Sequence, residues 1–160
     1  MSEKARLTLV RDIEKIDFVP THTATALTSA QAEQFGELLY ASYKGTVDDE
    51  GETLEESKQE AKESLDGKYG PAIWEASFAI SANNMLASAC LVIDRQGPFM
   101  AYVVTSPQFQ GKGLAKELIF HSLNALHLRA DKNLTLVVTA TNTPALALYR
   151  KLGFQEMIIK

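Results

Sequence analysis

One stretch of the chain carries most of the information about its fold: Val103-Val104-Thr105-Ser106-Pro107-Gln108-Phe109-Gln110-Gly111-Lys112-Gly113-Leu114-Ala115. An apolar strand leads into it, two glycines one residue apart follow the turn at Ser106-Pro107, and a helical pattern begins at Lys112. The first turn of a helix has unpaired N–H groups and a partial positive charge. Glycines leave those groups open to an anion. The stretch therefore predicts a cradle for a pyrophosphate.

Two common phosphate-binding motifs do not fit this stretch. The dinucleotide fingerprint needs three glycines and an acidic residue after the next strand. The phosphate loop needs Ser or Thr after its Gly-Lys pair, where this chain has Gly113. A glycine pair alone is also consistent with a plain turn before a helix, so the assignment needs further residues.

Those residues come from two signatures. Gln110-Gly111-Lys112-Gly113-Leu114-Ala115 resembles the Gln/Arg-x-x-Gly-x-Gly/Ala signature of the Gcn5-related N-acetyltransferase (GNAT) superfamily. Asn142-Thr143-Pro144-Ala145-Leu146-Ala147-Leu148-Tyr149-Arg150-Lys151-Leu152-Gly153-Phe154 resembles the second signature of the same superfamily, Asn-x-x-Ala-x-x-Leu-Tyr-x-x-x-Gly-Phe. The resemblance covers Ala72 to Lys160 well and Met1 to Gly70 only loosely.

The resemblance implies an α/β fold of three layers, the GNAT acyl-CoA N-acyltransferase fold, whose mixed and mostly antiparallel sheet is flanked by about four helices. It also implies direct transfer of an acetyl group from acetyl-CoA to a primary amine. The coenzyme pyrophosphate is expected on residues 110–115. Its pantetheine arm is expected between the strand ending at Val104 and a parallel neighbour at Leu134 to Thr139.

The resemblance assigns roles to individual residues. A backbone N–H at a bulge near Val103 or Val104 polarises the acyl carbonyl, and Asn142 hydrogen-bonds the coenzyme arm. Tyr149 is the expected general acid, since a phenol with a pKa of ~10 is protonated at neutral pH and can donate to a leaving thiolate. Packing of the Tyr149 ring on the core, and a turn role for Asn142, are the structural alternatives.

The general base is the point where the chain departs from the superfamily. Many members place a glutamate early in the strand before the bulge, but Pro98-Phe99-Met100-Ala101-Tyr102 has no carboxylate. Glu75, Asp94 or a water held by the backbone could take this role, and the sequence does not choose among them.

The resemblance also implies that the acceptor site lies largely at the segment joining the first two helices, which here is Gly45 to Thr53. Its carboxylates Asp48, Asp49 and Glu52, with Glu75, are candidates for holding a small cationic amine. Nine acidic residues and two lysines lie between Asp48 and Asp66, within a chain of net charge −4. This charge argues against nucleic acid as a ligand of that segment. A solvated loop and helix face is the alternative, and is preferred for Glu55 to Asp66.

Length and composition predict a single domain over residues 1–160, with 1–20 as an additional N-terminal strand segment. No apolar run is long enough to span a membrane, and no signal-peptide pattern follows Met1. The histidines have no metal-ligand spacing, so no metal is expected, and lone Cys90 in an apolar run reads as a buried, inert thiol. A cytoplasmic protein is the resulting expectation.

Hydrophobic periodicity and turn residues predict the order of the elements. Helices are expected from a cap at Thr28 to Gly45, from Thr53 to about Leu65, from Lys112 to about Ala130 and from Thr143 to Gly153. Strands are expected at Ala5 to Val10, Ala72 to Ser81, Met85 to Asp94, Phe99 to Val104, Leu134 to Thr139 and Phe154 to Lys160, with a short one near Thr25 to Leu27.

Only six residues follow Phe154, which suffices for one strand and not for a hairpin. The resemblance implies two closing strands after the Gly-Phe signature, so we expect the edge left open to pair with the N-terminal strand or with the same strand of a second subunit in a homodimer. Two rivals to the small-molecule enzyme remain open: a catalytically silent acyl-CoA-binding module, and an enzyme that acetylates protein N-termini or lysines.

Overall fold

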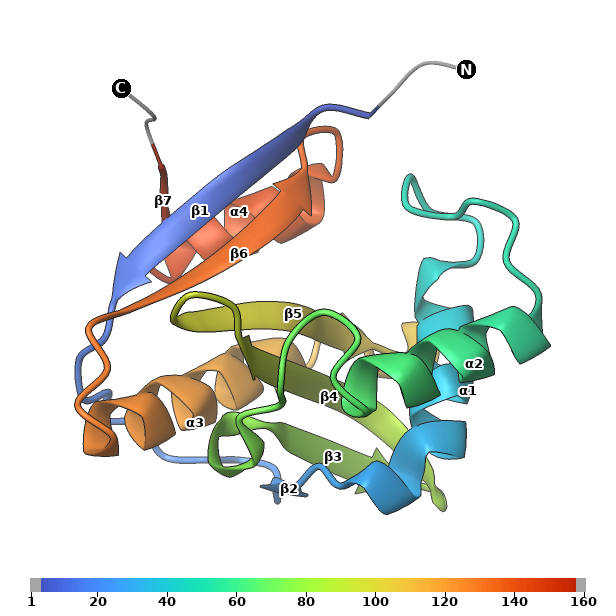
Figure 1. Cartoon of the computed structure of the whole chain (residues 1–160), viewed down its shortest axis with the longest axis horizontal. Helices are drawn as coiled ribbons and strands as arrows, with labels where there is room; N and C mark the ends of the chain where they lie inside the picture. The colour runs from blue at the N-terminus through green and yellow to red at the C-terminus, as the bar shows by residue number, and fades with distance from the viewer. Residues whose placement is uncertain (1–3, 158–160) are drawn as a thin grey trace.

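A computed structural model describes residues 4–157 of the chain. Seven strands form one sheet, and four α-helices flank it (Figure 1). The helices are α1 (Ala32–Tyr43), α2 (Leu54–Leu65), α3 (Leu114–Leu128) and α4 (Thr143–Lys151). The strands are β1 (Arg6–Asp12), β2 (Thr25–Ala26), β3 (Phe78–Ala82), β4 (Met85–Asp94), β5 (Pro98–Thr105), β6 (Asn133–Thr139) and β7 (Gln155–Glu156).

The strands lie in the order β2-β3-β4-β5-β6-β1-β7. All neighbouring pairs are antiparallel except β5 and β6, which are parallel. The sheet is therefore mixed and mostly antiparallel, with four α-helices, as the resemblance implied.

The sheet opens between its two parallel strands. Among the described residues, β5 and β6 pair only at Phe99 and Thr135. Figure 1 shows β6, with β1 and α4, diverging from β5 beyond this point. The backbone of the two strands is therefore left without a strand partner along the opening, which is where a ligand can enter the sheet.

A bulge in β5 lies beside this opening. Leu91 pairs with Tyr102 and Val92 with Met100, so Ala101 is the extra residue. The bulge was expected near Val103 or Val104, and that position is wrong: Val103 pairs with Cys90 and Val104 with Ala89 in regular register. The bulge depends on how β4 aligns with β5, which the residues of β5 alone do not specify.

Helices α1 and α2 pack together on one face of the sheet, over a core that includes Phe35, Leu39, Leu91 and Ile93. The two helices approach very closely at Gly36. A Cβ atom built there would lie 2.4 Å from the Cα atom of Lys58. Only glycine therefore allows this approach, which brings the loop 44–53 and α2 to the opening of the sheet.

Helices α3 and α4 belong to the core on the other face, which includes Leu118, Leu123, Leu134 and Phe154. Helix α3 begins at Leu114 rather than at Lys112 because Gly113, its N-cap, has φ +78°. It ends at Leu128, before Ala130, whose φ is also positive. No helix within residues 4–157 is long and apolar enough to cross a membrane.

The N-terminal strand β1 fills the place beside β6 within the same chain. It pairs with β6 over seven positions, from Arg6 with Thr139 to Asp12 with Asn133, and carries β7 on its other edge. No strand of a second subunit is needed at this edge of β6.

Residues 13–22, which come after β1 in the chain, form an N-terminal arm that runs along α3. Asn124 both accepts from the N–H of Ile16 (2.6 Å) and donates to its carbonyl (3.0 Å). The ring of Phe18 lies 5.2 Å from that of Phe120. Further along, the carboxylate of Glu117 accepts hydrogen bonds from the backbone and side chains of Thr21 and His22. His22 is therefore held against α3, and is not a free loop residue.

Two predicted strands differ from the structure. The strand expected over Ala72 to Ser81 is a single bridge between Ala72 and Ile93, a short 3₁₀ helix over Trp74–Ala76, and then β3. The Ser77 hydroxyl donates to the Ile73 carbonyl and fixes this turn, a contact that periodicity does not reveal. The last strand is shorter than expected, and residues 158–160 of that prediction lie outside the described residues.

Candidate functional site

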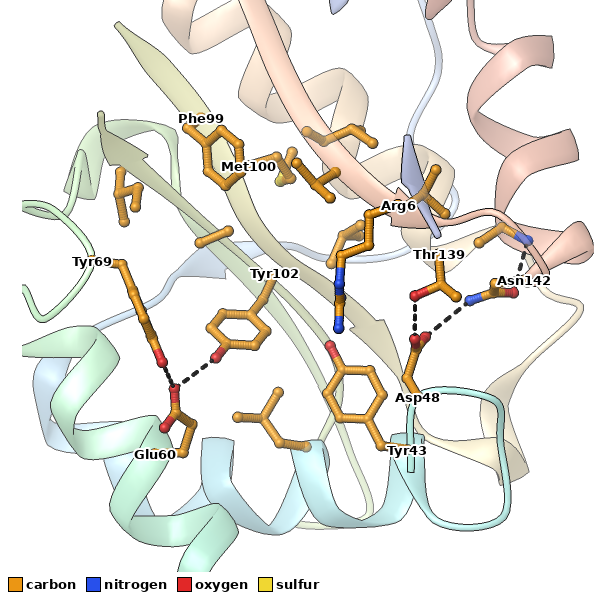
Figure 2. Close-up of a pocket in the computed structure, with 18 of the residues that line it drawn as sticks. Arg6, Tyr43, Asp48, Glu60, Tyr69, Phe99, Met100, Tyr102, Thr139 and Asn142 are labelled. Carbon is orange, nitrogen blue, oxygen red and sulfur yellow. Dashed lines mark hydrogen bonds between the residues drawn. The ribbon is translucent and has the colours of Figure 1, made fainter. Parts of the chain in front are cut away.

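The opening between β5 and β6 leads into a cavity of about 750 Å³. Its wall is built from both strands, from α1, α2 and α4, and from the loop 44–53 (Figure 2). The lining includes Tyr43, Asp48, Glu52, Glu60, Tyr102, Val103, Thr139, Asn142 and Tyr149. The cavity thus joins residues of the second signature to the acidic loop, although about ninety residues separate them in the sequence.

Tyr149 lies on α4 with only 9% of its surface exposed, and it lines the cavity. Its ring packs edge-on against Phe154, with the centroids 6.0 Å apart. Burial raises the pKa of the Tyr149 hydroxyl to about 12, and the negative charge of Asp48 adds to the shift. The phenol is therefore protonated at neutral pH and can donate a proton in the cavity.

Asn142 caps α4 and is fixed from two sides. Its side-chain oxygen accepts from the N–H of Ala145 (3.3 Å), and its amide nitrogen donates to Asp48 (3.3 Å). The hydroxyl of Thr139, at the end of β6, donates to the other oxygen of Asp48 at 2.6 Å. Figure 2 shows the Asp48 carboxylate pointing at both partners from the loop. Asp48 therefore bridges the opening of the sheet.

A second polar group lies at the α2 side of the cavity. The Glu60 carboxylate accepts from the hydroxyls of Tyr69 (2.5 Å) and Tyr102 (3.3 Å), as Figure 2 shows. Lys68 donates to its other oxygen at 3.3 Å. Burial alone would raise the pKa of Glu60, but the hydrogen bonds from Tyr69 and Lys68 outweigh it and hold the pKa below its usual range. Glu60 is therefore an anion at neutral pH.

Sequence reasoning placed Glu60 on a solvated helix face and did not identify Tyr43 as a cavity residue. Tyr43 lies next to the cavity at the end of α1, where burial raises its pKa. The sequence offers little to identify Glu60 as a cavity residue. Its partners Tyr69 and Tyr102 lie outside α2, and only the tertiary structure brings them to its carboxylate.

The acceptor candidates from the sequence separate into two groups. Asp48 and Glu52 line the cavity. Asp49 turns back on its own loop and accepts from the N–H groups of Gly45 and Gly51. Glu75 does not line the cavity; it lies in the 3₁₀ helix before β3 and pairs with Arg129 at 3.1 Å. Asp94, considered as a base, accepts from the N–H of Gly97 in a turn.

The two valines of β5, Val103 and Val104, lie in different environments. Val103 lines the cavity, whereas Val104 is buried in the core beneath α1 and α2. The Val104 carbonyl accepts from the Ser88 hydroxyl at 2.8 Å. Of the two positions expected to carry the carbonyl-polarising N–H, Val103 is the one at the cavity wall.

The glycine turn lies between β5 and α3, as the phosphate cradle requires. Gly111 and Gly113 both have φ +78°, a conformation that L-residues adopt only with strain. A Cβ atom on Gly111 would meet no heavy atom within 4 Å. The surface above the turn is therefore open, and Gln110, Lys112 and Ala115 flank it while Leu114 is buried in the core.

The described residues contain no group of three His, Cys, Asp or Glu side chains that could hold a metal ion. Cys90 is fully buried, and burial raises its pKa to about 11. It is therefore not a nucleophile at neutral pH.

Comparisons with known proteins agree with this geometry. The FR47-like protein family matches residues 80–159. Ribosomal protein bS18-alanine N-acetyltransferase of Escherichia coli (strain K12) is 32% identical over 87 residues, which are 52% of this chain and 57% of that protein. The chain therefore spans little more than half the length of this curated relative.

Solved structures extend the likeness to nearly the whole fold. The ribosomal-protein-S18-alanine N-acetyltransferase from Escherichia coli superposes with a TM-score of 0.66 at 22% identity, covering 85% of this chain and 79% of that one. The PaiA N-acetyltransferase from Thermoplasma acidophilum in complex with coenzyme A has a TM-score of 0.63 at 16% identity, covering 86% and 92%.

A mixed sheet that opens between two parallel strands, with a glycine turn at the start of the next helix, defines the class of acyl-CoA N-acyltransferase folds. The chain belongs to the Gcn5-related N-acetyltransferase superfamily and, within it, to the FR47-like protein family.

Proposed function

We propose that the chain transfers the acetyl group of acetyl-CoA directly to a primary amine that enters as a cation. The observation that carries this proposal is the single pairing of β5 with β6, at Phe99 and Thr135, beside a cavity that contains both Tyr149 and the acidic loop. An extended pantetheine arm fits such an opening, because unpaired strand backbone can hydrogen-bond its amides. The pyrophosphate then falls at the glycine turn before α3.

The residues present fit the three needs of acyl transfer. A backbone N–H near Val103, at the cavity wall, is the donor for the acyl oxygen, a role worth a few kcal/mol when the donor is held in place. Tyr149, buried and protonated, supplies the proton for the departing thiolate. The carboxylates of Asp48, Glu52 and Glu60 give the cavity a negative lining that attracts an ammonium group.

The class of amine is the finer part of the proposal. A small cationic acceptor is supported by the carboxylates of Asp48, Glu52 and Glu60, which line the cavity between α1, α2 and β6. The second candidate is a protein N-terminus, which the name of the bS18-alanine N-acetyltransferase relative favours. Both acceptors present a primary ammonium group, so the same carboxylates serve either one.

A thiol-release assay with acetyl-CoA tests the proposal. The panel contains ethylamine, putrescine, lysine, a peptide with an N-terminal alanine, and the same peptide with a blocked N-terminus as control. We expect release of free thiol only with open amines, together with a mass increase of one acetyl group on the amine. Binding of coenzyme with no amine-dependent release would favour the silent acyl-CoA-binding module instead.

Ionic strength gives a second test of the cationic acceptor. Attraction between exposed charges is screened over ~8–10 Å at physiological salt, so the acceptor KM should rise as salt is added. The KM for acetyl-CoA is the internal control for general salt effects on the enzyme. An acceptor KM that is the same at low and high salt would contradict the role of the acidic lining.

A further inference from the structure

The proton acceptor for the amine is the one chemical role that the sequence left open. The structure removes two candidates, because Glu75 and Asp94 do not line the cavity. Other carboxylates of the lining are engaged elsewhere. Glu56 accepts from the N–H of Thr53 as part of a helix cap, and Glu52 accepts from the N–H of Glu50 at 3.2 Å. Glu50 itself faces Arg6 at 3.9 Å, and Glu60 holds two tyrosine hydroxyls.

Asp48 differs from these carboxylates in where it is held. It comes from the loop between α1 and α2, but both of its partners belong to the other half of the opened sheet. The Thr139 hydroxyl donates to one oxygen at 2.6 Å, and the Asn142 amide donates to the other at 3.3 Å. Asn142 is in turn fixed by the N–H of Ala145. The carboxylate is therefore oriented at the end of β6, beside the start of α4.

This orientation leaves capacity for a further hydrogen bond. A carboxylate has about four lone-pair positions, and the protein occupies two of them in Asp48. The remaining positions can accept from an ammonium group in the cavity. Neither protein partner takes up a proton at neutral pH, so Asp48 is the proton acceptor of this group.

The negative charge of Asp48 also acts on Tyr149, the expected general acid. This charge contributes to the raised pKa of Tyr149, after burial, and contributes to that of Tyr43 together with Glu52. The other charged groups of the lining are Arg6 from β1, Glu50 and Glu52 from the loop, Glu56 and Glu60 from α2, and Arg95 from the turn before β5. Asp48 is hydrogen-bonded to Asn142, the cap of α4, and Tyr149 lies on that helix and lines the same cavity, where an acid and a base must both reach one reacting centre.

We propose that Asp48 is the catalytic base, which accepts the proton of the incoming ammonium group while Thr139 and Asn142 hold its carboxylate in position. The inference rests on the proposed acetyl transfer. One N–H bond of the ammonium breaks and its proton moves to the Asp48 carboxylate. The freed lone pair forms the C–N bond to the acyl carbon, the C–S bond breaks, and the thiolate takes a proton from Tyr149. The second proton lost by nitrogen returns to the tyrosinate, and Asp48 releases its proton to solvent before the next turnover.

A pH profile separates a base from a residue that only binds the cation. With an internal base, the enzyme uses the abundant ammonium form, so kcat/KM does not follow the fraction of free amine and stays level through the neutral range. Without a base, only the free amine reacts, and its fraction rises tenfold per pH unit up to the amine pKa. We therefore expect a plateau for the wild type with ethylamine or putrescine, and a continuous rise for Asp48→Asn.

The loss of rate in Asp48→Asn should depend on whether the amine enters as a cation. At neutral pH Asp48→Asn should lower kcat/KM for the basic amine by ~10²-fold or more, within the range of general-base catalysis. Trifluoroethylamine is already neutral at pH 7, so its rate should change far less. Asp94→Asn, the same substitution outside the cavity lining, should keep the plateau. Calorimetric titration with coenzyme A checks that each variant is folded.

Three results would overturn the assignment. The first is a plateau in Asp48→Asn like that of the wild type, and the second is its loss in Glu75→Gln instead. The third needs no variant: if the wild-type rate rises continuously up to the amine pKa, the enzyme uses no internal base. If no amine in the panel reacts with the wild type, the proposed function fails, and this inference fails with it. A reactive wild type without a plateau refutes only the inference.

Discussion

At the scale of single residues, the environment of Tyr149 decides which of its two roles applies. Its ring packs on Phe154, as a core residue would, yet its surface also lines the cavity. Burial and the charge of Asp48 raise its pKa to about 12, so it is protonated at neutral pH and can donate a hydrogen bond to the departing thiolate. Packing and proton donation are thus properties of the same side chain.

Tyr149→Phe separates the two roles because it keeps the ring and removes the proton. We expect kcat to fall by ~10²–10⁴-fold, as for a lost general acid, with little change in coenzyme affinity or melting temperature. Tyr40→Phe, on α1 and outside the cavity lining, is the matched control. Steady-state rates beside a calorimetric Kd give the answer. An unchanged kcat would leave Tyr149 with packing alone.

Several residues were placed correctly from the sequence because their signal is local. The glycine turn, the start of α3 within two residues and the start of α4 near Thr143 depend on short-range backbone geometry. The Ala101 bulge and the Glu60 group were missed because they depend on strand register and on the packing of α2 near Tyr69 and Tyr102. Such contacts join segments that no periodicity connects.

At the scale of elements, the close approach of α1 and α2 sets one wall of the cavity. Gly36→Ala should destabilise the fold by ~1–3 kcal/mol, as overpacking does, because the added carbon meets the Lys58 backbone and not the end of a flexible side chain. Glu37→Ala, at the exposed next position of the same helix, is the control. Urea denaturation measures both. Equal stability of Gly36→Ala and the wild type would mean that the helices separate at no cost.

The Glu117 carboxylate on α3 holds the N-terminal arm through hydrogen bonds from Thr21 and His22, and these depend on its ionisation. Burial alone would raise the pKa of Glu117, but hydrogen bonds from Thr21 and His22 outweigh it and lower the pKa to about 2. The unfolded value is ~4.3, so the folded state binds the proton less tightly. The stabilisation is therefore complete above pH ~5 and is lost as the pH falls toward 2.

Glu117→Gln should reveal this window directly. At neutral pH we expect a loss of ~2 kcal/mol, the scale of hydrogen bonds to a charged group. The difference from the wild type should shrink below pH 4 and vanish only below pH 2, where both side chains are neutral. Denaturation at each pH measures it, with Glu37→Gln as an exposed control. A difference independent of pH would show that charge is not the cause.

At the scale of the whole molecule, the N-terminal strand β1 covers the edge of β6 and joins β7 to the sheet. β1 covers β6 over seven pairs and carries β7, and its Leu9 is fully buried. Deleting Met1 to Val19 should expose the β6 edge and cause aggregation or a large loss of melting temperature. Removing residues 1–3, which leaves β1 complete, is the control. A soluble, monomeric and equally stable truncated protein would contradict this role.

The opening of the sheet and the glycine turn should together bind acetyl-CoA, and calorimetric titration measures this binding. The wild type should bind acetyl-CoA at one site per chain. Gly113→Asp should lose most of this affinity, because it strains a residue at φ +78° and adds a negative charge at the start of α3. Gly97→Asp, at another positive-φ turn, is the control for strain alone. Equal acetyl-CoA affinity in a folded Gly113→Asp variant, or no binding by the wild type, would contradict the account.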